Sequence, residues 1–148
     1  MKVYLDTSVI SALFDARNPE RQALTETFFR QSADFEVLSS EITLAEIERT
    51  HDIVLREKMR AVLMQFPIFD VDDRTESLAS EYVLHGAVPG NYRDDALHIA
   101  AAVVNDMDCL LSWNFDHLVK RKTKDIVKMV NTLNKLAQIE IMTPAELT

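Results

Sequence analysis

The sequence predicts an α/β fold in which a parallel sheet of about five strands is covered by helices on both sides. Three observations support this prediction. Short apolar runs alternate with segments of helical periodicity along the chain, which is typical of a parallel sheet built from successive strand–helix units. The first run, residues 2–5, reads as a strand buried on both faces. The 148 residues, 47% of them hydrophobic, suffice for one domain over residues 1–148.

The limits of the elements follow from apolar spacing and from turn-forming residues. Five short apolar runs are the expected strands, and they cover residues 2–5, 35–39, 67–71, 108–112 and 139–142. The segments with helical spacing cover residues 9–14, 18–34, 41–50, part of 51–66, 74–85, 94–105, 115–120 and 125–137.

Prolines and glycines justify several of these limits. Pro19 suits the first turn of a helix because its φ is preset, whereas Pro67 cannot continue the helix before it. The loop at 86–90 contains two glycines and is the clearest break in the chain. The helix at 94–105 is apolar nearly all round, as in a helix that is buried between neighbours.

The composition excludes several classes of function. With only two glycines, Gly86 and Gly90, the chain can form neither a dinucleotide-binding fingerprint nor a phosphate-cradling P-loop. The single cysteine, Cys109, has no partner for a disulfide and suits a reducing compartment. Because no run of 18 apolar residues and no basic leader occurs, we expect a cytoplasmic protein without a membrane segment.

The net charge of −8 argues against a surface coated in positive charge for nucleic-acid binding. The basic residues are, however, unevenly spread. Six of the sixteen lie in one window of sixteen residues, and they are Lys120, Arg121, Lys122, Lys124, Lys128 and Lys135. Such a run is either a solvated helix face or a local basic patch.

Asp6 lies where the first expected strand turns into a helix. Ligands of open parallel sheets bind beyond the carboxyl ends of the strands, so an acid at this place is a candidate site residue. Asp6 is equally suited to be the N-cap of the next helix, as are Thr7 and Ser8. The choice between these interpretations depends on whether other acids reach the same edge.

Glu46 follows the second expected strand and is flanked by apolar residues. Thr43-x-x-Glu46 matches a capping box, in which the glutamate accepts a hydrogen bond from the N-cap amide. Taken alone, this pattern favours the cap.

Asp94 is the natural N-cap of the helix at 94–105, which leaves Asp95 in the first turn, where the helix dipole favours a negative charge. A second carboxylate at the start of an apolar helix is costly to bury without a partner or a metal. His98, one turn further on, is either a ligand or hydrogen-bonding neighbour or a satisfied core histidine. The second interpretation is favoured because the sequence has no Cys and His spacing of a zinc site.

Ser112, Asn114 and Asp116 follow the strand at 108–112 and fall at the same edge as Asp6 if the two strands are neighbours. The alternative is a polar turn that caps a short helix. Trp113 is suited either to stacking on a base or to packing.

Several oxygen ligands can therefore approach one edge of the sheet, and they are Asp6, Glu46, Asp95, Asn114 and Asp116. Carboxylates so close repel one another unless a cation holds them together. Oxygen ligands without a thiolate or imidazole set select Mg²⁺ or Mn²⁺.

Four short motifs resemble, in their order, the PIN-domain ribonucleases and especially the VapC-type toxins of prokaryotic toxin–antitoxin pairs. The motifs are Asp6-Thr7-Ser8, Thr43-Leu-Ala-Glu46, Asp94-Asp95-Ala-Leu-His98-Ile-Ala-Ala and Leu111-Ser112-Trp113-Asn114-Phe115-Asp116-His117. The ending Met142-Thr-Pro-Ala-Glu-Leu147 is also similar to that of the family, so the resemblance covers nearly the whole chain. It implies a three-layer α/β/α fold whose acidic pocket binds Mg²⁺ or Mn²⁺ and hydrolyses single-stranded or loop RNA.

By this resemblance Asp6, Glu46 and Asp95 match the three acids of the family. Asn114 stands where many members have a fourth acid, a departure that removes one charge for a second ion, although Asp116 can supply part of it. Ser112 matches an orienting hydroxyl. In the implied metal-assisted hydrolysis Asp6 and Asp95 hold the ion, with Asn114 beside them, and Glu46 binds through or activates a water.

The resemblance further implies an RNA substrate, a cognate antitoxin and a homodimer. The basic cluster at 120–128 would then contact the RNA backbone without reading its sequence. A rival hypothesis is a non-catalytic PIN scaffold that binds RNA or a protein, with Asn114 as a sign of decay. A phosphatase of the haloacid dehalogenase type is disfavoured because Ser8 stands where its second Asp is expected. A response-regulator receiver is disfavoured because Asp6 has no acidic neighbour.

Overall fold

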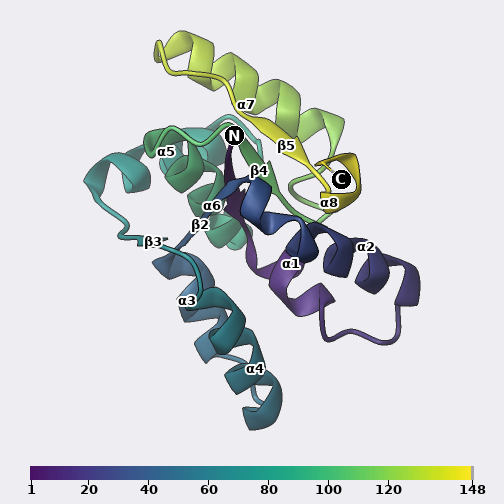
Figure 1. The fold of residues 1–148 in the computed structure, drawn as a ribbon. Coiled ribbons are helices and arrows are strands. Elements are labelled where there is room, and N and C mark those ends of the chain that lie inside the picture. Colours follow the sequence, from purple (N-terminus) through teal and green to yellow (C-terminus); the bar gives the residue numbers. More distant parts are fainter. Residues whose placement is uncertain (148) are drawn as a thin grey trace.

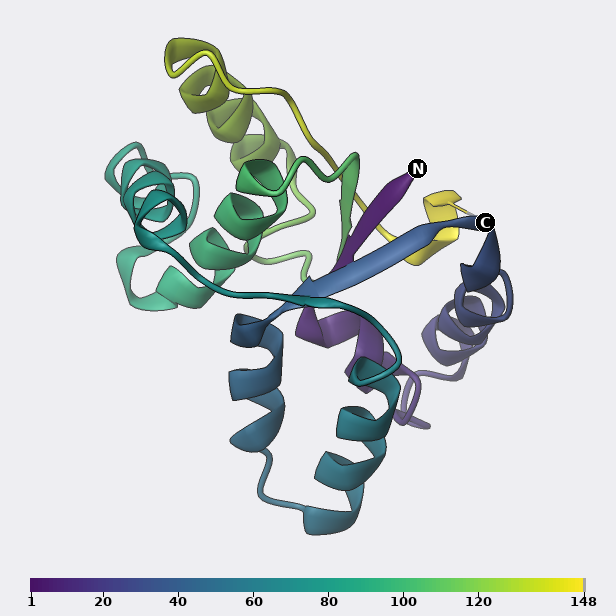
Figure 2. The same ribbon diagram turned by 60° about the vertical axis from the view of Figure 1, so that its left-hand side comes forward.

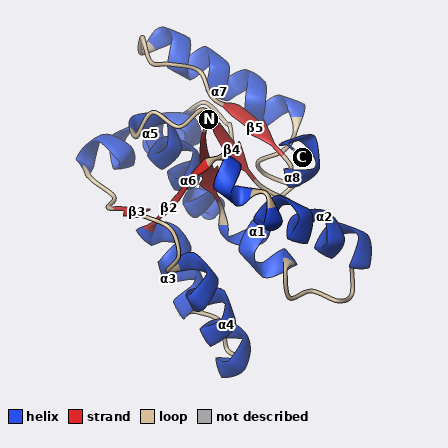
Figure 3. Cartoon of the chain, viewed as in Figure 1, coloured by secondary structure: helices blue, strands red, loops and turns tan. Residues whose placement is uncertain are grey.

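A computed structural model of the chain describes residues 1–147 and contains the expected five-stranded sheet. The strands are β1 (Lys2–Leu5), β2 (Glu36–Ser40), β3 (Ile68–Phe69), β4 (Cys109–Leu111) and β5 (Glu140–Met142). Their order in the sheet is β3-β2-β1-β4-β5, and every neighbouring pair is parallel (Figure 3). In this register Val3 of β1 pairs with Val37 on one side and with Cys109 on the other. The central position of β1 places the carboxyl ends of β2 and β4 beside Asp6.

Helices cover both faces of the sheet. They are α1 (Thr7–Ala12), α2 (Pro19–Arg30), α3 (Glu41–Glu48), α4 (Ile53–Leu63), α5 (Asp73–Leu84), α6 (Arg93–Val104), α7 (Arg121–Leu133) and α8 (Pro144–Leu147), with 3-10 helices η1 (Ser32–Asp34) and η2 (Gly90–Tyr92). Figure 1 shows α5, α6 and α7 on one side of the sheet and α1, α2 and α8 on the other, while α3 and α4 form a hairpin that projects from the body. Figure 2 shows the two arms of this hairpin side by side. The predicted α/β/α class is confirmed.

The period-two alternation of a strand explains how β1 serves two cores at once. Tyr4 packs into the core beneath α5, α6 and α7, whereas Val3 and Leu5 pack into the core beneath α1, α2 and α8. All three side chains are fully buried. Each such burial contributes about 1.5–3 kcal/mol, so the short strand is held firmly from both faces.

The segment at 115–120 was expected to be a helix, and this expectation is wrong. Residues 115–118 form turns, because the amides of Leu118 and Val119 both donate to the Asn114 carbonyl, at 3.1 and 2.8 Å. This segment therefore forms a single turn rather than a helix. Helix α7 begins at Arg121, earlier than the expected residue 125, because the buried Thr123 hydroxyl in its first turn is within 2.8 Å of the Ala87 carbonyl.

Other limits also differ from expectation, and helix α7 ends at Leu133 rather than at residue 137. Strand β3 has two residues instead of five, because it is an edge strand that pairs only with Ser39 and Ser40 of β2. Helix α2 ends at Arg30, and η1 covers the last expected turn. The start of α2 is as predicted, since Asn18 caps the helix and Pro19 occupies its first position. Within residues 1–147, none of the helices combines the length and the apolarity needed to cross a membrane.

Candidate active site

Four elements bring polar side chains to the carboxyl edge of the sheet. Asp6 follows β1, Glu46 lies on α3 directly after β2, and Asp95 lies in the first turn of α6. The fourth contribution is the loop after β4, which starts at Ser112. Because β1 lies between β2 and β4, these segments meet although more than 100 residues separate the first from the last.

Asp6 is both a helix cap and a buried acid of this edge. Its Oδ1 accepts hydrogen bonds from the backbone N of Ser8 at 3.0 Å and from the Ser8 hydroxyl at 2.6 Å, which makes it the N-cap of α1. Its Oδ2 accepts a hydrogen bond from the Ser112 hydroxyl at 2.7 Å. Burial raises the pKa of the Asp6 carboxyl, and the charge of Glu46 adds to the rise, against the opposing effects of His98 and the two serines. The N-cap and the candidate site residue are therefore compatible interpretations of Asp6.

Two serine hydroxyls tie the end of β1 to the end of β4. The Ser8 hydroxyl accepts a hydrogen bond from the Trp113 amide at 2.8 Å, and the Ser112 hydroxyl accepts one from the Asn114 amide at 2.9 Å. Each serine also donates to Asp6. The Asp6 carboxylate is thus oriented by hydroxyl groups that are themselves fixed by backbone amides.

Glu46 is not the capping residue that its spacing indicated. The N-cap of α3 is Ser40, whose hydroxyl accepts from the Ile42 amide at 3.2 Å. The Oε1 of Glu46 instead accepts a hydrogen bond from the Thr7 hydroxyl at 2.7 Å and contacts His98 Nε2. Burial acts to raise the pKa of Glu46, but the hydrogen bond and charge of His98, together with Thr7, lower it overall. The capping box does not form, because α3 already begins at Glu41 and because side chains from α1 and α6 bind the same carboxylate.

His98 joins the acidic edge to the core. Its side chain is buried, and its Nδ1 lies 2.7 Å from the Tyr4 hydroxyl, which in turn lies 2.6 Å from the Ser40 hydroxyl. Burial alone would lower the pKa of His98, but Tyr4, Glu46 and Asp6 raise it well above the usual value. The prediction of a satisfied core histidine is confirmed, and the same ring also supports Glu46.

Asp95 lies in the first turn of α6, but Asp94 is not the cap. The residue at the N-cap position is Tyr92, without a side-chain cap, and Asp94 forms an ion pair with Arg49 at 2.9 Å. Asp95 Oδ2 lies 2.9 Å from His117 Nδ1. Burial raises the pKa of Asp95, and the charge of Glu46 contributes to the rise, while His98 and His117 oppose it.

The remaining candidate residues lie on the loop after β4 and differ in their contacts. Asn114 Nδ2 lies 3.4 Å from Asp95 Oδ1, and its Oδ1 accepts a hydrogen bond from the His117 amide at 3.0 Å. Asp116 is exposed and makes no side-chain hydrogen bond with the part of the chain that the structure describes. Trp113 is buried, and its Nε1 donates to the Thr25 hydroxyl at 2.9 Å, so packing rather than base stacking explains it.

The sequence predicted no site role for Thr7 and His117, which contact Glu46 and Asp95, or for Tyr92, which contacts His117. Thr7 lies in the motif at residues 6–8 and His117 in the motif at 111–117. Helix capping explained the first residue and turn formation the second, so neither indicated a contact with an acid. Tyr92 gave no signal, because its contact with the ring of His117, at a centroid distance of 4.0 Å, joins two loops far apart in sequence.

The donor chemistry of this edge fits a hard divalent cation. Asp6 is buried and Asp95 half-buried, and burial raises the pKa of both carboxyls. The charge of His98 lowers both pKa values and that of Glu46 raises them, so these acids depend on a positive charge beside them. In residues 1–147 as they stand, no three side chains of Asp, Glu, His or Cys converge closely enough to hold a metal ion. Each acid is instead engaged with a serine, threonine or histidine.

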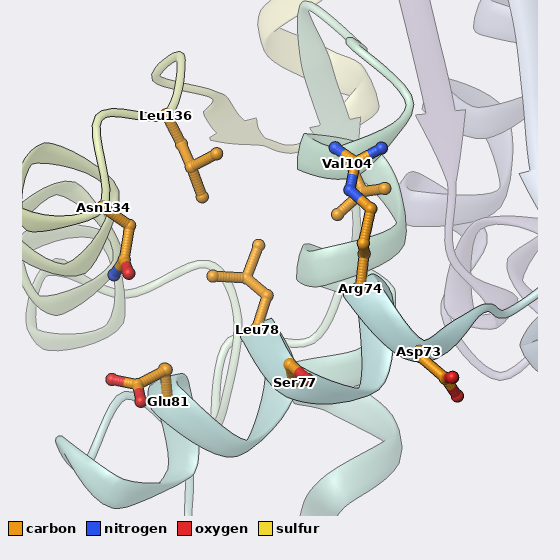
Figure 4. A pocket seen from close by; sticks show the side chains of 8 residues that line it. All are labelled: Asp73, Arg74, Ser77, Leu78, Glu81, Val104, Asn134 and Leu136. Carbon is orange, nitrogen blue, oxygen red and sulfur yellow. The ribbon is translucent and has the colours of Figure 1, made fainter.

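One cavity lies at the site, and a second lies away from it. One of about 300 Å³ opens beside the acids and is lined by Glu46, Asn91, Tyr92, Arg93, Asp94 and Asp95. A larger one of about 490 Å³ lies between α5, the end of α6 and the end of α7, where Figure 4 shows Leu78 and Leu136 from opposite walls. None of the candidate acids lines this larger cavity.

Comparison with known proteins identifies the fold. A family model described as the PIN domain matches residues 3–124. The structure of VapBC2 from Rickettsia felis, bound to a DNA fragment from its promoter, is similar with a TM-score of 0.60 and 14% identity, covering 95% of this chain and 97% of that one. VapC20 of Mycobacterium tuberculosis, described as a sarcin–ricin loop cleaving toxin, is similar with a TM-score of 0.58 and 18% identity, covering 78% and 92%. The curated protein sequences gave no match.

Proposed function

The chain belongs to the PIN-domain family, and on this premise we propose that it is a divalent-metal-dependent endoribonuclease and the toxin of a toxin–antitoxin pair. The observation that carries the proposal is that Asp6, Glu46 and Asp95, which come from three distant segments, stand together at the carboxyl edge of the sheet, where the charge of Glu46 acts to raise the pKa of both Asp6 and Asp95. An arrangement of like charges around one edge is costly unless it serves a cation. The similarity to two VapC structures is consistent with this activity.

The proposed site residues divide into ligands and supports. Asp6 and Asp95 would hold the Mg²⁺ or Mn²⁺ ion, with Asn114 beside Asp95. When bound, such an ion polarises the phosphodiester and stabilises charge on its oxygens. Ser112 orients Asp6 through its 2.7 Å hydrogen bond. Asp116, which is exposed, would contribute only through its charge near the loop.

Glu46 is suited to orient the attacking water. Both of its hydrogen bonds, from Thr7 and with His98, involve Oε1. Its other oxygen, Oε2, has no hydrogen-bond partner among residues 1–147, and Glu46 lines the cavity of about 300 Å³. Because His98 keeps the pKa of Glu46 low, the carboxylate is ionised at neutral pH and can accept a hydrogen bond from the water that it orients.

The test compares RNA cleavage by the intact chain with cleavage by Asp6→Asn and Asp95→Asn variants, with Mg²⁺, with Mn²⁺ and with EDTA. We expect cleavage only with a divalent ion, and a loss of at least about 100-fold in each variant. The matched control is Asp34→Asn, because Asp34 is an exposed carboxylate at the opposite edge, at the end of η1 before β2. Cleavage that is indifferent to both site substitutions would end the enzyme hypothesis. RNA binding without cleavage would favour the non-catalytic scaffold.

The basic residues of α7 and its N-cap are proposed to bind the RNA backbone. All six residues of the cluster named above are exposed, and the nearest to the site, Lys120 and Arg121, follow the loop that carries Asn114. Exposed cations contact phosphates without reading sequence, and such binding weakens as salt increases. Combined charge reversal of Lys120, Arg121 and Lys124 should weaken RNA binding and flatten its salt dependence, whereas unchanged binding would refute this part of the proposal.

The remaining proposals concern extent, location and partners. We propose that the domain spans residues 1–148, which is supported by β5 pairing with β4 and by α8 packing into the core of α2, both beyond residue 124. A cytoplasmic location is supported by Cys109, which is free and buried.

For an antitoxin, the exposed apolar residues Ile53 and Val54 on the projecting α4 are suitable contacts. Co-purification with the product of a neighbouring gene would test the antitoxin, and light scattering would test the homodimer.

A further inference from the structure

An exposed aromatic ring lines the cavity that two of the candidate acids, Glu46 and Asp95, also line. Tyr92 ends η2 and is 46% exposed, although tyrosine rings usually bury most of their surface. It lines the cavity of about 300 Å³ together with Glu46 and Asp95. The ring is therefore accessible and next to the place where a phosphodiester would be cleaved.

The ring of Tyr92 is not a loose surface group. Its centroid lies 4.0 Å from that of the His117 ring, with 42° between the two planes. His117 is fixed in turn, because its Nδ1 lies 2.9 Å from Asp95 Oδ2 and its backbone amide donates to Asn114 Oδ1 at 3.0 Å. Tyr92 is thus supported on one side by a ring that is itself anchored to the candidate metal ligand.

The cations around this cavity are already committed to carboxylates. Arg93, which lines the cavity, pairs with Glu76 at 2.8 Å. Arg49 pairs at 2.9 Å with Asp94, another lining residue. A nucleic-acid strand that approaches the acids therefore gains little from these charges. Stacking on an aromatic ring is a contact that does not depend on charge and that every base can make.

We propose that Tyr92, supported by His117, is the platform on which an unpaired nucleobase of the RNA substrate stacks beside the scissile phosphate. The inference deepens the proposed ribonuclease function and rests on it. A base must be unpaired to cover the ring, so the platform selects single-stranded or loop RNA over a duplex without selecting its sequence.

The test measures binding rather than cleavage. Fluorescence anisotropy with a labelled single-stranded RNA is performed in an Asp6→Asn background, which prevents cleavage and leaves the contacts of Tyr92 unchanged. Added Tyr92→Ala should raise Kd by about 5- to 150-fold, the range for one stacked base. Tyr92→Leu, which keeps an apolar contact with His117 but has no ring face, should lose as much. Tyr92→Phe should stay within about twofold of the parent.

A matched control separates stacking at this cavity from a general loss of aromatic surface. Phe115 is 48% exposed on the same loop as Asn114, but it packs beside Trp113 and Arg21 and does not line the cavity. Phe115→Ala should leave Kd within about twofold of the parent. An unchanged Kd for Tyr92→Ala, or an equal loss for Phe115→Ala, would overturn the platform.

Failure of the platform and failure of the nuclease are distinguishable. Cleavage that requires Asp6 but not Tyr92 overturns the platform alone. Ring-dependent binding by a chain that cleaves no RNA supports the platform as a base-binding site and removes only the catalytic proposal. A 2-aminopurine base in the RNA gives a further readout, because its fluorescence should be quenched by stacking on Tyr92 and should recover in Tyr92→Leu.

Discussion

The Asp6→Asn substitution should abolish activity and yet stabilise the fold. Asp6 is 4% exposed, and burial is the largest influence on its pKa, which is raised overall. An acid whose pKa is raised by folding is destabilising when ionised. Asparagine removes the charge and keeps the shape, so the free energy of unfolding should increase while the candidate metal ligand is lost.

The magnitude follows from the contacts of the carboxylate. The two hydrogen bonds from Ser8 to Oδ1 would become neutral, and the bond with Ser112 would also reverse its direction, because the asparagine amide nitrogen donates and cannot accept. A hydrogen bond loses about 1 kcal/mol when its charged partner becomes neutral, hence about 3 kcal/mol in all. Relief of the buried charge returns several kcal/mol. Since the pKa is raised rather than lowered, the second effect is the larger. We expect a net gain of about 1 kcal/mol, or about 3 °C in Tm.

The assay is thermal and urea unfolding followed by circular dichroism, in EDTA, over a range of pH. Below the unfolded-state pKa the wild-type carboxyl is protonated in both states, so the variant should have no advantage. As pH rises through the raised folded-state pKa, the wild type loses stability and the advantage of the variant should appear in full. Asp116→Asn is the control, because Asp116 is exposed. A variant less stable than the wild type at neutral pH, or an advantage that grows on acidification, would refute the reasoning.

Three further predictions follow from single contacts. Glu46→Gln should lower the pKa of His98, measured by NMR of the imidazole, because the charge of Glu46 helps to keep it raised; an unchanged titration would contradict the pairing. Trp113→Phe should lower the free energy of unfolding by about 1–3 kcal/mol in urea, since it leaves the buried threonine hydroxyl without the Nε1 donor. Gly86→Ala should lower the free energy of unfolding by about 1 kcal/mol, because the φ of Gly86 is +82°, although a Cβ would have space there. Gly90→Ala should leave the free energy of unfolding nearly unchanged, because Gly90 has no positive φ and its Cβ would make an ordinary 3.7 Å contact. Equal losses in the two variants would show that backbone strain is not the cause.

Much of the fold was predictable because its signals are local. Apolar runs such as that around β1 and helix starts such as Asn18-Pro19 depend on neighbours in sequence, and the structure bears them out. The segment at 115–120 was predicted wrongly because its polar and apolar spacing suits a helix. Its turn is set instead by the Asn114 carbonyl, which binds two successive amides.

The sequence by itself determined the class of fold and which acids stand at strand ends, because strand and helix periodicity and the order of motifs are properties of the chain. Only the tertiary structure decided which group each acid meets. Glu46 does not form the predicted cap because it contacts Thr7 and His98, which lie on other elements. Asp94 forms an ion pair with Arg49 instead of capping α6. These choices depend on the side-by-side position of β1, β2 and β4, a long-range pairing that no local pattern encodes.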